Sequence, residues 1–155
     1  MKNQHRLKEQ LIKHIKGGQA FSSIDVILNK IFYSVIGIVT DGLPYSFYQQ
    51  FFHIREAQLD SINYCRDEEY VAPEWPDEYW TDAKAPDSEQ EWQSLINSYY
   101  DERDAFCNML RESDSDLLKP FDTNPGHNLL REAELIIEHT AYHTGQLYII
   151  YRLVK

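Results

Sequence analysis

The chain has 155 residues, of which 43% are hydrophobic and 26% are charged, and this composition is ordinary for a globular protein. Its formal net charge of −10, without any stripe of basic residues, argues against a protein that binds the phosphates of nucleic acids. The apolar runs are far shorter than the roughly twenty residues that a transmembrane helix needs, so no membrane partner is expected.

A chain of this length usually folds as one unit, so we expect a single domain over residues 1–155. The amino-terminal segment carries charges throughout and lacks the apolar stretch of a signal peptide. The two cysteines, Cys65 and Cys107, lie in helical patterns and form no CxxC motif. Two free thiols are typical of a reducing compartment, which makes the cytoplasm the expected location.

The first predicted element is a helix over residues 3–16, with apolar residues at helical spacing. The Gly-Gly pair that follows is expected to end this helix, because glycine accepts the left-handed conformation found there. A short second helix is predicted in "IDVILNKIF", with Ser22 and Asp25 at the spacing of a capping box. The stretch "VIGIVTDGLP" is then predicted to be a connection.

A long helix is predicted from about residue 46 to residue 67, with Ser46 and Gln49 at capping-box spacing. Residues 70–87 contain three prolines and two tryptophans and are predicted to form a loop. Loops of this length are uncommon in compact domains and are often functional. We therefore expect this aromatic loop to fold back over the body of the protein.

The next helix is predicted over residues 88–111, with another capping-box pair at its start. After a polar loop, Asn124 and Pro125 are expected to cap and begin the last helix, over residues 126–153. Four substantial helices predict an all-α fold. We expect a four-helix bundle with an extra short N-terminal helix and the long aromatic loop.

The last predicted helix contains "EHTAYHTGQLYIIYRL", in which His139 and His143 are four residues apart. Residues at this spacing lie on one face of a helix, one turn apart, so both imidazoles can point at one place. The pair lies at or beside the core-facing stripe. Buried imidazoles need partners, because an unpartnered buried polar group costs roughly 1–3 kcal/mol. A divalent metal ion satisfies both at once.

A metal site needs at least one more ligand, and His53 is the remaining histidine near the middle of a long helix. If the two helices are neighbours, His53 completes a three-His site with His139 and His143. Three histidines with an open position are the arrangement of a catalytic zinc-type site. Surface or satisfied core histidines remain the alternative. The other histidines are expected at the surface or at helix ends: His5, His14 and His127.

The motif lacks the general base of a peptidase. A zincin has Glu directly after its first His, and an inverzincin has Glu directly before its second. This chain has Thr140 and Tyr142 at those positions. It also lacks the Glu-x-x-His pairs of di-iron bundles. Peptidase-type chemistry is therefore not expected.

The stretches "HTAYHTGQL", "FFHIREAQLD" and "GGQAFSSIDVIL" together resemble the DinB/YfiT-like superfamily of metalloenzymes over most of the chain. The HxxYHxGQ pattern is the most specific part. The resemblance implies a four-helix bundle, often a homodimer, with a divalent metal held by one histidine of the second long helix and two of the last. Matched by motif, these are His53, His139 and His143. One departure is Phe21, where many relatives have a histidine after the Gly-Gly segment.

Better characterised members of this family transfer low-molecular-weight thiols, such as bacillithiol, mycothiol or glutathione, or catalyse thiol-dependent isomerisation. The resemblance therefore implies an enzyme that uses Zn, Ni, Fe or Mn to transfer such a thiol to a small-molecule electrophile. Water in place of the thiol makes the reaction hydrolase-like. The alternative is a non-catalytic dimeric metal-binding or stress-related bundle protein. A fourth protein ligand that closes the site would favour that alternative.

Four further residues are candidates for a role near the histidines. Tyr142 and Gln146 are candidate cofactor-binding residues, with packing and a helix–helix hydrogen bond as the alternatives. Asp60, seven residues after His53 and so on the same helix face, is a candidate for orienting a metal ligand, with a surface acid as the alternative. Gly145 is costly in a helix interior and is expected to permit close approach of another helix or a ligand.

Overall fold

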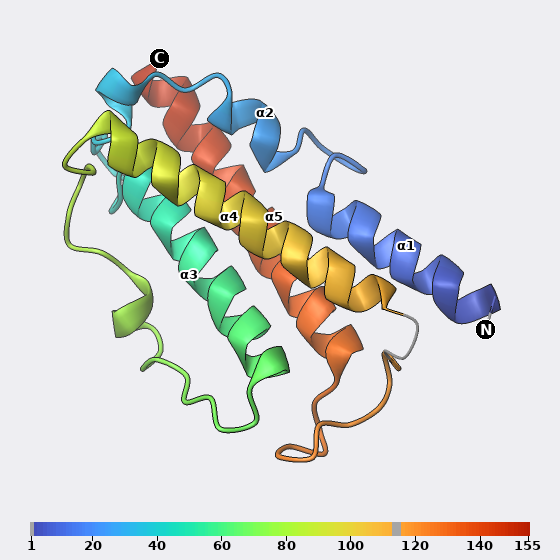
Figure 1. Ribbon diagram of the computed structural model, residues 1–155. Coiled ribbons are helices and arrows are strands. Elements are labelled where there is room, and N and C mark those ends of the chain that lie inside the picture. Colours follow the sequence, from blue (N-terminus) through green and yellow to red (C-terminus); the bar gives the residue numbers. More distant parts are fainter. Residues whose placement is uncertain (1, 113–115) are drawn as a thin grey trace.

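The computed structural model describes residues 2–112 and 116–155. Over these ranges it contains no strand, and its helices are α1 (Lys2–Lys16), α2 (Ile24–Leu28), α3 (Phe47–Arg66), α4 (Glu89–Arg111) and α5 (Leu129–Val154). Single 3₁₀ turns occur at Tyr33–Val35 and Asp77–Tyr79. Helix α3 packs against both α4 and α5, and α1 packs against α4 and α5 (Figure 1). The expected all-α bundle with one short extra helix is confirmed.

Two clusters of buried side chains form the core. The first joins α2, α3, α4 and the end of α5, and Phe51 is at its centre, edge-on to Trp92 at 5.2 Å and to Tyr99 at 5.3 Å between ring centroids. The second joins α1 to the other ends of α3, α4 and α5. Helix α1 is thus a full member of the bundle. No helix within the described residues is long and apolar enough to cross a membrane.

The start of α3 forms as the sequence predicts. The Ser46 Oγ accepts a hydrogen bond from the Gln49 N–H at 3.1 Å, and the Gln49 Oε1 accepts one from the Ser46 N–H at 3.1 Å. This reciprocal capping box satisfies two donors that the first helical turn leaves without partners.

The predicted starts of two other helices are wrong. Helix α5 begins at Leu129 with Asn128 as its N-cap, whereas Asn124 lies in a turn in which its carbonyl accepts from the His127 N–H at 2.9 Å. Helix α2 has Ser23 as its N-cap, without a side-chain hydrogen bond. Asp25 forms no capping box there because its carboxylate pairs with Arg103 on α4, at 2.8 Å.

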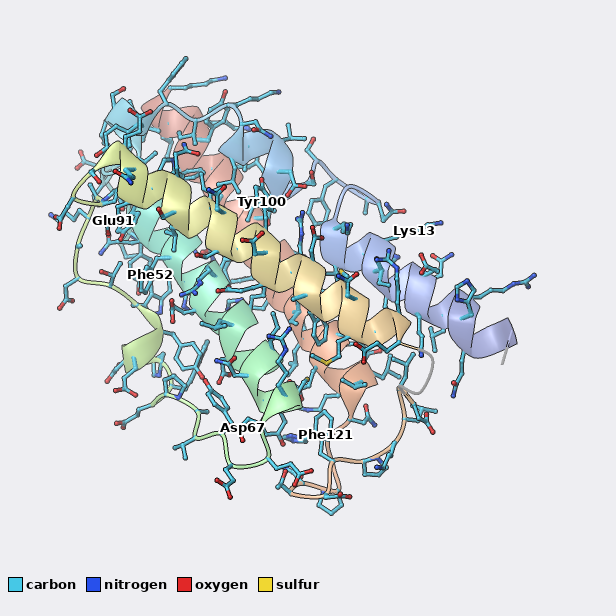
Figure 2. All side chains as sticks on the ribbon, viewed as in Figure 1. Lys13, Phe52, Asp67, Glu91, Tyr100 and Phe121 are labelled. Atoms are coloured by element: carbon cyan, nitrogen blue, oxygen red, sulfur yellow. The ribbon has the colours of Figure 1, made fainter. Side chains whose placement is uncertain are left out.

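The aromatic loop between α3 and α4 folds back along α3, as expected. It leaves the bundle at Asp67 and returns near Glu91, both labelled in Figure 2. Polar side chains on successive turns of α3 donate hydrogen bonds to carbonyls of the loop: Ser46 to Lys84 at 2.6 Å, Gln49 to Thr81 at 2.9 Å, and His53 to Tyr79 at 3.2 Å. The end of the loop therefore runs antiparallel to α3 and covers its amino-terminal half.

Candidate metal centre

His53 on α3 meets His139 and His143 on α5 in the middle of the bundle. The Nε2 atoms of His53 and His139 are 3.0 Å apart. The ring of His143 lies 4.6 Å from that of His53 and 4.4 Å from that of His139, measured between centroids. One ligand nitrogen from each ring lies within 4.8 Å of the other two. The structure thus brings together the three histidines that the sequence singled out.

The ring of His53 is held by its edge and by one face. Its Nδ1–H donates to the Tyr79 carbonyl at 3.2 Å, and because a carbonyl only accepts, the proton is on Nδ1 and the Nε2 keeps its lone pair. The indole of Trp80 stacks on the ring at 3.9 Å between centroids, with 5° between the planes. Trp80 is stacked in turn on Tyr45 at 3.9 Å. The loop and the segment before α3 therefore set the position of this imidazole.

The ring of His143 is contacted by two glutamines. Its Nδ1 lies 3.1 Å from the Gln146 Oε1, and the amide nitrogen of Gln50 contacts the same Nδ1. A protonated Nδ1 donates to the Gln146 Oε1, and this tautomer leaves the Nε2 with a lone pair for a metal. In this tautomer the Nδ1 accepts no hydrogen bond from the Gln50 amide nitrogen, which is itself a donor. Tyr142 is 66% exposed and packs edge-on against the ring, at 4.8 Å between centroids. Of the two candidate cofactor-binding residues, Gln146 orients a histidine and Tyr142 lies outside the cluster.

All three imidazoles are neutral at physiological pH. Burial lowers the pKa of His53 to about 4, against an opposing contribution from its bond to Tyr79. Burial, together with the neighbouring His143 and His53, lowers the pKa of His139 to about 3. The pKa of His143 is lowered by burial too, and Gln146 partly opposes this shift. Neutral imidazole is the form that binds metal ions.

The cluster fits a divalent metal ion. A tetrahedral zinc with Zn–N bonds of about 2.05 Å separates its ligand nitrogens by about 3.3 Å, close to the 3.0 Å between the His53 and His139 Nε2 atoms. Within the described residues, no cysteine or carboxylate joins this group of possible ligands. The three-His group could therefore hold a metal ion and leave a position for water or substrate. Three imidazoles suit zinc, nickel, iron or copper.

A chamber of about 290 Å³ lies beside His139, and we call it the His139 chamber. Its wall is largely apolar and is formed by α3, α5 and the aromatic loop. The residues that line it include Gln58, Asp60, Trp75, Tyr79, Leu135 and His139. Burial raises the pKa of the Tyr79 phenol, and its hydrogen bond to Asp60 raises it further. Asp60 is thus engaged with the loop beside the cluster.

No other helix within the described residues approaches Gly145 closely, because a Cβ placed there meets no heavy atom within 4 Å, and close approach of a ligand stays a prediction. His127 lies at a helix end, as expected, directly before the N-cap of α5; it is half-buried, and its Nδ1 lies 2.8 Å from the Tyr64 hydroxyl. Cys65 and Cys107 are free thiols, as expected. Burial raises the pKa of Cys65 to about 12, so it is not a reactive thiol at neutral pH.

Sequence reasoning missed Trp80, Tyr79 and Gln50. Trp80 and Tyr79 lie in the aromatic loop, whose length and composition predicted a functional role but did not indicate which residues the loop contacts. Gln50 precedes His53 by three residues and so lies on the same helix face, which was the available signal.

Long helices that bury three histidines on two neighbouring helices define a helical-bundle protein with a candidate metal centre. A family model described as the DinB superfamily matches residues 34–147, which include the three histidines and the whole of α3 and α4. The chain belongs to the DinB superfamily. Searches of curated proteins and of solved structures gave no match.

Proposed function

We propose that the chain is a divalent-metal-dependent enzyme that transfers a low-molecular-weight thiol to a small electrophile. The observation that supports this most is the convergence of three neutral imidazoles, His53, His139 and His143, beside a chamber of about 290 Å³. When bound, a divalent cation lowers the pKa of a coordinated thiol and so supplies thiolate at neutral pH. Zinc, nickel, iron and manganese are the candidates.

The surrounding residues supply orientation and binding. Tyr79 and Trp80 hold His53, and Gln146 holds His143, which Gln50 also contacts. The same two glutamines line a second cavity of about 220 Å³. We assign this cavity to the thiol, because glutamine amides suit the polar groups that such thiols carry. Tyr142, exposed beside His143, is the second candidate for contact with the thiol.

The proposed reaction needs no carboxylate base. The thiol proton passes to solvent, and the sulfur electron pair forms a bond to the electrophilic carbon. In a displacement, the leaving group departs with the electron pair of its bond to that carbon. This agrees with a motif that has Thr140 and Tyr142 where peptidases have glutamate.

The test begins with metal content. The protein is purified without a histidine tag, and bound metal is measured by elemental analysis beside His53→Ala and His143→Ala. We expect a stoichiometric divalent ion in the wild type and loss of it in both variants. The loaded protein is then assayed for conjugation of glutathione, bacillithiol and mycothiol to the fluorogenic electrophile monochlorobimane. A wild-type protein that takes up none of the four metals would refute the proposal of a metal-dependent enzyme.

We also propose that the chain forms a homodimer through the outward face of α5. On this face Tyr142, Ile149 and Leu153 are each at least 50% exposed, and exposed apolar stretches mark interfaces. Light scattering after size exclusion tests this, with Ile149→Glu expected to give a monomer. A dimer that binds metal but conjugates no thiol would favour the competing function, a non-catalytic metal-binding protein.

A further inference from the structure

We infer that the His139 chamber binds the electrophile, and that it selects a flat, largely apolar molecule that is neutral or cationic and carries an N–H or O–H donor. That the bound molecule is the electrophile rests on the proposed function. The preference for a donor and against an anion rests on the chamber wall alone.

The shape of the wall favours a flat apolar body. Trp75 and Tyr79 meet edge-on at 4.9 Å between ring centroids and form the side of the chamber supplied by the loop. Leu135 and Ile136 form the side supplied by α5. A volume of about 290 Å³ holds one substituted aromatic ring rather than a larger molecule.

Two residues that line the chamber each have a buried acceptor atom without a partner among the described residues. The Gln58 Nε2–H donates to the Tyr99 carbonyl at 3.0 Å, which fixes the amide and directs its oxygen away from that carbonyl. Gln58 is 2% exposed, and its Oε1 has no hydrogen-bond partner among the described residues. The Oδ1 of Asp60 also has no hydrogen-bond partner among these residues, while the Tyr79 hydroxyl donates to the same carboxylate. Buried acceptors without partners are rare in folded proteins, so a donor on a bound molecule is expected to satisfy them.

The charge of the wall disfavours anions. Asp60 is the charged residue among those that line the chamber, and no lysine or arginine accompanies it there. In the metal-free protein, a carboxylate in this chamber would meet unpaired acceptors and like charge, whereas an amidinium would meet complementary groups.

The test uses three probes of one shape and different charge: benzamidine, benzamide and benzoate. Each is titrated into the full-length protein, and binding is followed by NMR of the tryptophan indole N–H signals, assigned with Trp75→Phe. We expect the Trp75 signal to move while that of Trp92, which is 2% exposed in the core, stays in place. Benzamidine should bind most tightly, and benzoate at least tenfold more weakly.

Substitutions in and near the chamber test which residues cause this selection among the probes. Asp60→Asn should weaken benzamidine roughly tenfold or more, the range for a charge-assisted hydrogen bond, and should remove the discrimination against benzoate. Glu134→Gln removes one negative charge from the exposed surface of α5 and is the matched control, with affinities unchanged. Leu135→Trp fills the chamber without removing a polar group and should abolish binding of all three probes.

Two results would overturn the inference: benzoate binding as tightly as benzamidine, or no shift of the Trp75 signal by any probe at 10 mM. Each titration is run with excess EDTA and again with zinc. If the protein takes up no metal but still selects among the probes in EDTA, the inference about the chamber is supported and the proposal of a metal-dependent enzyme is refuted. Metal uptake without probe binding supports the enzyme's metal site and refutes the chamber.

Discussion

The imidazole of His53 lies flat against the indole of Trp80, with 3.9 Å between their centroids and 5° between their planes. The same loop supplies the Tyr79 carbonyl that accepts from the His53 Nδ1–H. A connecting loop therefore forms part of the candidate metal centre without contributing a candidate ligand. Changes in this loop should alter metal affinity while all three imidazoles remain in place.

The first prediction concerns Trp80. Trp80→Ala removes the face contact of His53, and we expect metal affinity to fall about 10- to 100-fold, the usual effect of removing a group that orients a ligand. Competition with a chromophoric chelator measures this affinity. Trp80→Phe retains a ring to stack and should recover most of it. Equal affinities in the wild type and a folded Trp80→Ala protein would contradict the role assigned to the loop.

The second prediction separates Gln146 from Tyr142. Gln146→Leu removes the acceptor of the His143 Nδ1–H, and we expect metal affinity to fall about tenfold. Gln50→Leu should lower the affinity less, because a protonated Nδ1 accepts no hydrogen bond from the Gln50 amide nitrogen. Tyr142→Phe should leave affinity unchanged, since this residue packs outside the cluster. A loss of affinity in Tyr142→Phe would reverse the assignment.

Much of this architecture was predictable because it depends on local sequence. Helical periodicity located the four long helices, and the Ser46 capping box formed as predicted, since both depend on residues within one or two turns. The three histidines were found because helical spacing places His139 and His143 on one face and leaves one centrally placed partner, His53.

The rest depends on contacts between distant segments, which no local pattern records. Asp25 has the spacing of a capping residue, but its carboxylate binds Arg103, 78 residues away, and this contact overrides the local preference. The predicted start of α5 failed because the turn at Asn124 precedes the true cap, Asn128. The stacking of Trp80 on His53 could not be predicted without knowing how the loop returns along α3.

The third prediction concerns pH. The pKa values of His53 and His139, about 4 and about 3, lie below the value of about 6.5 of an unfolded chain. As pH falls from about 6.5 to about 4, the unfolded chain binds protons at these residues that the folded chain does not. The metal-free protein should therefore lose stability over this range.

Urea denaturation at pH 7 and pH 5 measures this loss. The midpoint should fall further in the wild type than in the double variant His53→Gln/His139→Gln, in which carboxylates and the remaining histidines account for the change. Equal falls in the two proteins would show that the buried imidazoles do not contribute. Addition of zinc should raise the wild-type midpoint at pH 7 and leave that of the variant unchanged.

The fourth prediction compares two glycines. A Cβ at Gly37 would lie 2.6 Å from the Cβ of Ala85, where the end of the loop packs on the segment before α3. We expect Gly37→Ala to lower the free energy of unfolding by about 1–3 kcal/mol, the usual range for overpacking. Gly145 has open space around it within a helix, so Gly145→Ala should raise it by about 0.5–1 kcal/mol. Urea denaturation measures both, and a destabilised Gly145→Ala protein would indicate that a second chain packs there.

His53 and His139 are 86 residues apart in the sequence, and they meet only after α3 and α5 have packed together. A cation held between them thus binds the native chain and not the unfolded one, and it adds stability that grows with the free metal concentration. Because proteases act on the unfolded fraction, metal supply would govern how long each copy of the chain survives after synthesis. Cells starved of the metal should then contain less of the protein, whatever the rate at which it is made.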